Sequence, residues 1–129
     1  MKDFVPLAPV TDPNRVVSAI AEVLGVRESG ERSLLDGLTS FLGTRRCLLV
    51  LDNFEQVAEA AGAISQLLGG CSNLKVLVTS RSALHVYGEQ IRSVEPLSLP
   101  VPGQRPPLTE LAQYDAVRLF AARARAVVA

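Results

Sequence analysis

Aromatic residues are scarce in this chain. They make up 5% of its 129 residues, and there is no tryptophan. The sequence therefore offers few rings on which bases or sugars could stack. Hydrophobic residues still account for 48% of the chain, so the core has to be built from leucine, valine, alanine and isoleucine. The length suits one domain with a single core.

An excess of charge of either sign is also absent. The 13 basic and 13 acidic residues cancel, and Lys2 and Lys75 are the only lysines. A surface for nucleic acid or an anionic membrane needs clustered basic residues, so we expect no direct nucleic-acid contact. No apolar run reaches the roughly 18 residues of a membrane span, and Met1 is not followed by a signal peptide. We therefore expect no membrane contact either.

Cysteine and histidine are nearly missing as well. Cys47 and Cys71 are the only cysteines, and His85 is the only histidine. Two cysteines are too few for a disulfide framework or a zinc site. We therefore expect reduced thiols in a cytoplasmic protein, and a loop position for His85.

Hydrophobic periodicity predicts an alternation of strands and helices. The best-marked helix follows Asp12, a natural N-cap, and Pro13, which suits the first helical position, and it should end at Gly25. The pattern predicts strands over residues 4–10, 47–51, 74–78 and 90–94, and helices over residues 13–24, 34–42, 57–68 and 111–129. Five prolines between residues 96 and 107 indicate a linker.

The predicted fold class is α/β with a mostly parallel sheet. Residues 47–51 are continuously apolar, which is typical of a strand covered on both faces. Together with the helix and strand that follow, they form a stretch of about 30 residues, the size of a β-α-β unit.

Two predicted strands end in polar residues that suit a nucleotide. LLVLDN, residues 48–53, ends in Asp52, which could hold Mg²⁺ directly or through water or could simply cap the next helix. KVLVTSR, residues 75–81, ends in Arg81, which could form bidentate bonds with a terminal phosphate or lie in an ordinary surface turn. In a right-handed β-α-β unit both strands run the same way, so these two side chains emerge at one sheet edge. The pair suggests a nucleotide site.

At their spacing, these motifs resemble the NB-ARC-type domains of STAND-class P-loop NTPases, which occur in bacterial transcriptional regulators of the SARP and LuxR types. The resemblance runs from RRCLLVLDNFE (residues 45–55) through KVLVTSR to LSLP (97–100). FVPLAPVTDPNRVVSAIAEVLGV (4–26) is similar to the second strand and helix of that family, and YDAVRLFAARARAV (114–127) to the first helix of its small helical domain. The resemblance implies a partial nucleotide-binding α/β domain over residues 1–100, a proline-rich linker over 101–110 and a helical segment over 111–129.

The resemblance also implies residue roles. Asp52 matches the Walker B acid that binds Mg²⁺, and Arg81 matches the sensor arginine that reads the terminal phosphate. Asn53 and Thr79 fall at nucleotide-binding positions. Many relatives have a second acid where Asn53 stands, and an amide cannot act as a general base, so Glu55 is the candidate substitute. The intact protein would bind ATP or ADP with Mg²⁺, hydrolyse it slowly, and control transcription through other domains.

The chain departs from this family at one essential motif. It contains no Gly-Lys pair, so the Walker A loop, G-x-x-x-x-G-K-[ST], is missing. In the family that loop and the first strand lie upstream, and an adenine-binding GLPL-type motif lies downstream. The resemblance therefore implies a partial three-layer sandwich, inactive on its own and binding nucleotide weakly or not at all. The edge of strand 74–78 would be open, which predicts self-association or a sheet rearranged by residues 90–94.

Two other functions remain open. A truncated paralogue could act as a nucleotide-independent protein-interaction module, pairing through the open edge. A receiver-like phosphoacceptor domain could use Asp52, but it would need an acidic pair after its first strand and a lysine after a later one. The sequence offers only Asp12 at a helix start and Lys75 at the beginning of a strand.

Overall fold

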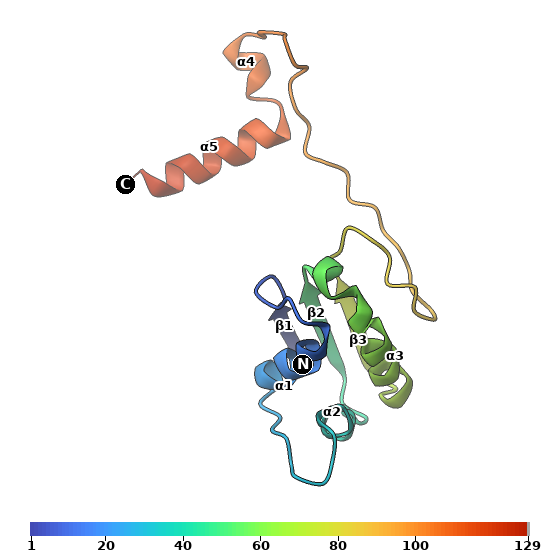
Figure 1. Ribbon diagram of the computed structural model, residues 1–129. Coiled ribbons are helices and arrows are strands. Elements are labelled where there is room, and N and C mark those ends of the chain that lie inside the picture. Colours follow the sequence, from blue (N-terminus) through green and yellow to red (C-terminus); the bar gives the residue numbers. More distant parts are fainter. Residues whose placement is uncertain (129) are drawn as a thin grey trace. The chain divides into compact units, whose positions relative to one another are not determined.

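The computed structural model describes residues 1–128. The chain divides into two units, Met1–Ile91 and Arg92–Ala129. The first unit holds a sheet and three α-helices, and the second holds two helices (Figure 1). The predicted division at residues 100 and 110 concerns domains of a longer protein and stays a prediction.

Three parallel strands form the sheet of the first unit. They are β1 (Lys2–Pro6), β2 (Cys47–Asp52) and β3 (Leu74–Val78), in the order β1-β2-β3. The register pairs Val5 with Leu51 and Leu51 with Val78. The α/β class with a parallel sheet is confirmed, and β3 covers the residues predicted for it.

Helices fill the connections between the strands. A 3₁₀ turn over Pro13–Arg15 leads into α1 (Val16–Leu24), and α2 (Leu34–Leu42) follows. A 3₁₀ segment over Phe54–Ala60 leads into α3 (Ala61–Gly70). The predicted caps of the first helix are in place. Asp12 accepts a hydrogen bond from the Asn14 amide at 3.0 Å, and Gly25 has the left-handed φ of 71° that favours glycine.

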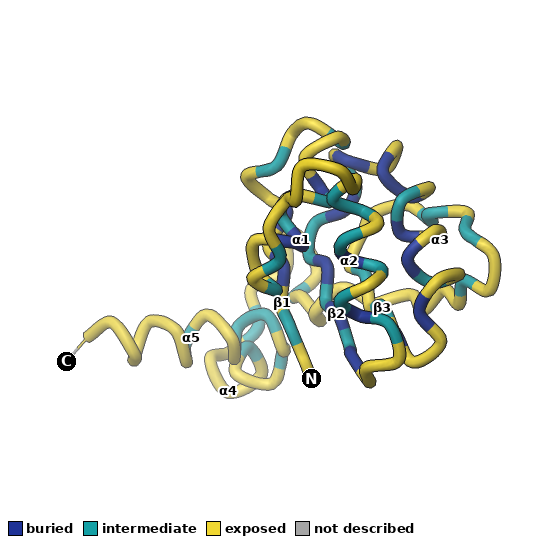
Figure 2. The backbone as a smooth tube through the Cα atoms, turned by 90° about the horizontal axis from the view of Figure 1, so that it is seen from below, coloured by how far each residue is buried: buried dark blue, intermediate teal, exposed yellow. Residues whose placement is uncertain are grey.

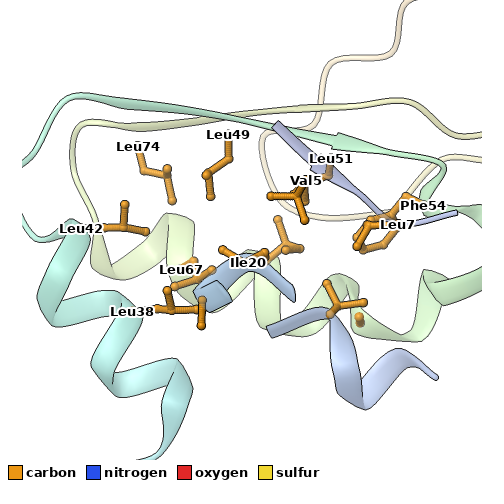
Figure 3. Packing of buried hydrophobic residues seen from close by; sticks show 14 of the residues in the cluster. Val5, Leu7, Ile20, Leu38, Leu42, Leu49, Leu51, Phe54, Leu67 and Leu74 are labelled. Atoms are coloured by element: carbon orange, nitrogen blue, oxygen red, sulfur yellow. The ribbon is translucent and has the colours of Figure 1, made fainter. Parts of the chain in front are cut away.

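The helices pack against one face of the sheet, as the topology requires. Each step from β1 to β2 to β3 moves one strand in the same direction, and right-handed connections then place every helix on the same side. Figure 3 shows Val5, Leu49 and Leu51 directed towards these helices. The fully buried residues of α1, α2 and α3 include Val16, Ile20, Leu38, Leu42, Ile64 and Leu67. Figure 2 shows the buried segments gathered in this unit.

Within the unit Met1–Ile91, no helix lies on the opposite face of the sheet. Burial alternates along β2, with Leu49 and Leu51 buried and Leu48 and Val50 only partly buried. The expectation that this strand is covered on both faces is therefore wrong. The continuous apolar run of β2 makes both faces of the strand apolar, but the unit Met1–Ile91 covers only one of them with helices.

Two strand predictions also need correction. The strand predicted over residues 4–10 ends at Pro6, because the Leu7 amide makes the last hydrogen bond to β2, at 2.9 Å from the Asp52 carbonyl, and Pro9 lies in the turn that follows. Residues 90–94 form no strand, so they do not rearrange the sheet. Ile91 and Val94 are 69% and 91% exposed. An apolar pair without a neighbouring strand has no ladder to join.

The second unit contains α4 (Leu108–Leu111) and α5 (Asp115–Val127). Ser98 lies beside the start of α5. Its hydroxyl accepts a hydrogen bond from the Asp115 amide at 2.8 Å, and its carbonyl accepts one from Ala116 at 3.2 Å. An upstream serine therefore caps this helix, and the 13 residues of α5 contain no buried side chain.

Candidate functional site

Asp52 and Thr79 meet at the carboxyl ends of β2 and β3. The Thr79 hydroxyl donates to Asp52 Oδ1 at 2.6 Å and accepts from the Asn53 amide at 3.0 Å. The backbone continues the ladder, since the Thr79 amide donates to the Leu51 carbonyl at 3.0 Å and the Phe54 amide donates to the Thr79 carbonyl at 2.9 Å. One hydroxyl thus fixes both the carboxylate and the turn that follows it.

Asn53 turns the chain sharply after β2. Its φ of 66° and ψ of 59° lie in the left-handed region, which asparagine tolerates better than other residues that carry a Cβ atom. Phe54, the next residue, is fully buried and anchors the turn in the core. Asp52 is therefore placed at the sheet edge by a ladder on one side and a buried ring on the other.

Arg81 and Glu55 form an ion pair at the same carboxyl end of the sheet. Arg81 Nε lies 3.5 Å from Glu55 Oε1, and the two side chains are 86% and 20% exposed. A pair this open contributes about 0–1 kcal/mol, so Arg81 can leave it at little cost. The predicted site residues lie at the end of β2 or in the segments that follow β2 and β3, and their roles stay predictions; they are Asp52, Asn53, Glu55, Thr79 and Arg81.

Glu89 is a further residue that sequence reasoning missed. Its carboxylate oxygens accept hydrogen bonds from the Leu84 and His85 amides, both at 2.8 Å. These bonds, the Leu84 bond foremost, lower the pKa of Glu89. His85 has a left-handed φ of 58°, so the carboxylate closes a tight loop just after Arg81. The one sequence signal is the glycine before it, Gly88, whose φ is also positive.

The chemistry of this edge fits one hydrated magnesium ion. Asp52 supplies a carboxylate whose second oxygen could bind Mg²⁺ through water, the usual arrangement when phosphates complete the shell. Within residues 1–128, no three histidine, cysteine, aspartate or glutamate side chains form a metal cluster. The described residues therefore contain no cluster of three such side chains that could hold a metal ion without help from a ligand.

The two thiols lie away from this edge, in the core. Burial raises the pKa of Cys47 and of Cys71, and both are free. Cys47 begins β2, at the opposite end from Asp52. Neither thiol is placed to act on a ligand of the candidate site.

Comparison with known proteins finds longer proteins that are similar to this chain over part of their own length. No family model matches the chain. A Mycobacterium tuberculosis protein named "Putative HTH-type transcriptional regulator" is 38% identical over 125 residues, which is 96% of this chain and 13% of that protein, and a Mycobacterium bovis protein of that name has the same values. An "Uncharacterized protein" of Mycobacterium tuberculosis is 36% identical over 122 residues, 94% of this chain and 28% of that protein.

The chain thus spans 13% of the length of the first of these relatives. The similarity extends over both units of the structure, because it covers 96% of the chain. None of the helices in residues 1–128 is long and apolar enough to cross a membrane.

Proposed function

We propose that this chain is part of a nucleotide-binding switch domain, of the NB-ARC/STAND class of P-loop NTPases, in a cytoplasmic transcription regulator. One observation carries the proposal: Thr79 is hydrogen-bonded to Asp52 at the carboxyl end of a parallel sheet, and the Arg81–Glu55 ion pair joins the segments that follow the same two strands. Ligands of open α/β sheets bind at that edge. Relatives named as transcriptional regulators support the regulatory setting.

The ligand would be ATP or ADP with Mg²⁺. Asp52 would hold the ion, and Thr79 would keep the carboxylate in place through its 2.6 Å hydrogen bond. The magnesium ion would neutralise phosphate charge when bound. The phosphate-binding loop that the chain lacks would come from another part of a longer protein, together with the rest of a three-layer P-loop sandwich.

Arg81 would act as the sensor of the terminal phosphate. Its present partner is Glu55, at 3.5 Å. A terminal phosphate offers more charge and a bidentate geometry, so it would draw Arg81 away from Glu55. The nucleotide would then bias the balance between two arrangements of this edge. Glu55, once released, is the candidate to orient water for slow hydrolysis.

A nucleotide-independent interaction module is the second candidate. It is favoured by the sheet order, because β3 is the last strand and no described strand pairs with its outer side. Strand addition at such an edge joins two chains through main-chain hydrogen bonds. Association that persists without nucleotide and is abolished by a proline at Val76, whose amide alternates to the side of β3 away from β2, would favour this function.

Chemical-shift mapping of the ¹⁵N-labelled chain tests the nucleotide site directly. We expect ADP with Mg²⁺ to shift the amides of Asn53, Thr79 and Arg81, with a dissociation constant of about a millimolar, roughly −4 kcal/mol. The Asp52→Ala, Arg81→Ala double variant should lose these shifts. Shifts of equal size in the double variant, or no localised shift at roughly 10 mM, would refute the assignment of this edge.

A second variant tests the sensor role of Arg81. Glu55→Gln removes the competing carboxylate, so it should tighten MgATP binding about threefold, in line with the small energy of an exposed pair. Glu59→Gln is the matched control, because Glu59 is exposed on the same 3₁₀ segment and has no ion pair in the described residues. Equal affinity in both variants would argue that Glu55 does not restrain Arg81.

A further inference from the structure

Arg81 lies on a short segment that is held at both ends. At its start, the Thr79 amide continues the ladder to β2 at 3.0 Å. At its end, Leu84 packs against the hydrophobic core, and its amide donates to Glu89 Oε1 at 2.8 Å. The residues between these anchors, 80–83, belong to no helix or strand. The position of Arg81 therefore depends on both anchors.

Glu89 makes the second anchor, together with the tight turn before it. The Glu89 amide closes this turn with a hydrogen bond of 3.1 Å, and Gly88 supplies the positive φ of 77° that the third residue of such a turn requires. The chain thereby folds back, and each carboxylate oxygen accepts one amide, from Leu84 or from His85, both at 2.8 Å. We call this loop, residues 84–89, the Glu89 clip.

The geometry of the Glu89 clip calls for a carboxylate. Both donors are main-chain amides, so the side chain has to offer two acceptors, and an ionised carboxylate has no hydrogen to point at them. A glutamine has the same length, but it offers a single oxygen and would turn its NH₂ group towards one of the amides. The clip therefore distinguishes glutamate from glutamine at this position, although the two side chains have almost the same shape.

We propose that Glu89 is a positioning residue for Arg81. By closing the clip, it fixes the far end of the segment 80–83 and so limits the places that the guanidinium can reach. One of these places is beside Glu55, 3.5 Å away, and the other, under the proposed function, is the terminal phosphate. A segment held at both ends has less conformational freedom to lose when Arg81 binds a phosphate. The proposal rests on the proposed function for its ligand, but not for the order of the segment.

Two variants open the Glu89 clip by different means. Glu89→Gln removes one acceptor and the charge, whereas Gly88→Val forces a β-branched residue into a positive φ and keeps the carboxylate. A Cβ atom at Gly88 would meet no atom within 4 Å, so this change acts through the backbone conformation. Glu95→Gln is the matched control for the loss of charge, because Glu95 is exposed and has no ion pair in the described residues.

Relaxation of the ¹⁵N-labelled full chain, measured without nucleotide, tests the positioning itself. We expect the order parameter of the Arg81 amide to fall from about 0.8 to below about 0.6, the range of a flexible loop, in both clip variants. It should stay unchanged in Glu95→Gln. The amides of β2 should keep their chemical shifts, which shows that the sheet is intact. A rigid Arg81 amide in both clip variants, although the Leu84 and His85 amides have lost their protection against hydrogen exchange, would overturn the proposal.

Titration with MgATP then tests whether the position of Arg81 matters for the ligand. Each clip variant should weaken binding about threefold in the parent chain. Neither should weaken it further when Arg81 is already alanine, because the effect acts through that side chain. Equal weakening in the Arg81→Ala background would overturn the proposal. A parent chain that binds no MgATP at roughly 10 mM would refute the proposed function instead, and the relaxation measurement would still decide whether Glu89 positions Arg81.

Discussion

Replacing Thr79 with valine should loosen the carboxyl edge of the sheet. Valine keeps the β-branched shape and its strand preference, so the change removes the hydroxyl and little else. That hydroxyl makes two bonds, to Asp52 Oδ1 at 2.6 Å and from the Asn53 amide at 3.0 Å. An intramolecular hydrogen bond contributes about 0.5–1.5 kcal/mol. Because Thr79 is exposed, water replaces part of each bond, and we expect a total loss of about 1–2 kcal/mol.

A double-mutant cycle separates the two bonds. Asp52→Ala removes only the bond that Thr79 donates, so it should cost about half as much as Thr79→Val. The combined variant should be hardly less stable than Thr79→Val alone, because the bond to Asp52 is already lost there. The resulting coupling energy should be about 0.5–1 kcal/mol. Thr79→Ser keeps the hydroxyl and serves as the control.

Urea unfolding followed by circular dichroism measures these differences. For a unit the size of Met1–Ile91, a loss of 1 kcal/mol also lowers the melting temperature by about 4–8 °C. A Thr79→Val variant within about 0.3 kcal/mol of the parent chain would refute the argument. So would strictly additive effects of Asp52→Ala and Thr79→Val, because then the hydroxyl and the carboxylate would not act on each other.

Three further changes follow from single observations. Hydrogen bonds from the Leu84 and His85 amides lower the pKa of Glu89, so their contribution is present above the usual glutamate range and is lost as pH falls through the lowered pKa. The protection of these two amides against hydrogen exchange, measured relative to the intrinsic rate at each pH, should fall there, and Glu89→Ala should lack this protection at every pH. Asn53→Val should cost about 1–2 kcal/mol in urea unfolding because φ is 66°, whereas Asn53→Gly should change stability by only a few tenths. Because burial raises the pKa of the Cys47 and Cys71 thiols, a disulfide reagent should modify them at the rate of unfolding, and rapid modification in native buffer would contradict that burial.

Most of the secondary structure could be predicted because local signals and core contacts agree. The helix α2 covers the residues where its apolar period predicted it, since Leu38 and Leu42 are fully buried. The strand β3 is likewise where its apolar run lies. Gly25 ends α1 as predicted, because the left-handed residue that stops a helix is most often glycine.

Predictions that depended on an unseen neighbour failed. Residues 90–94 have a strand-like composition, but a strand also needs a partner with free hydrogen-bonding groups, and composition does not report one. The prediction that β2 is covered on both faces failed for a similar reason. The apolar run shows that both faces of the strand are apolar, but the direction of the connections decides which face receives the helices of this unit.

The candidate site was predictable in position but not in its contacts. Because β2 and β3 are parallel, the segments after Asp52 and Val78 lie at the same end of the sheet. This could be predicted from the sequence pattern. The hydrogen bond from Thr79 to Asp52 joins residues 27 positions apart, and the Arg81–Glu55 pair depends on side-chain rotamers. Neither contact could be predicted from the spacing of these residues in the sequence. Glu89 is harder still, because its partners are backbone amides that every residue carries.

The topology of the sheet also decides on which side the candidate site is open. Connections that all advance in one direction place α1, α2 and α3 on one side and leave the other open. Asp52 pairs in register with Pro6, and it lies in the strand positions that point to the open side, like Leu48 and Val50. The carboxylate that is proposed to hold magnesium therefore emerges on the side of the sheet that α1, α2 and α3 leave free, so that a bound nucleotide would not have to displace any of these helices.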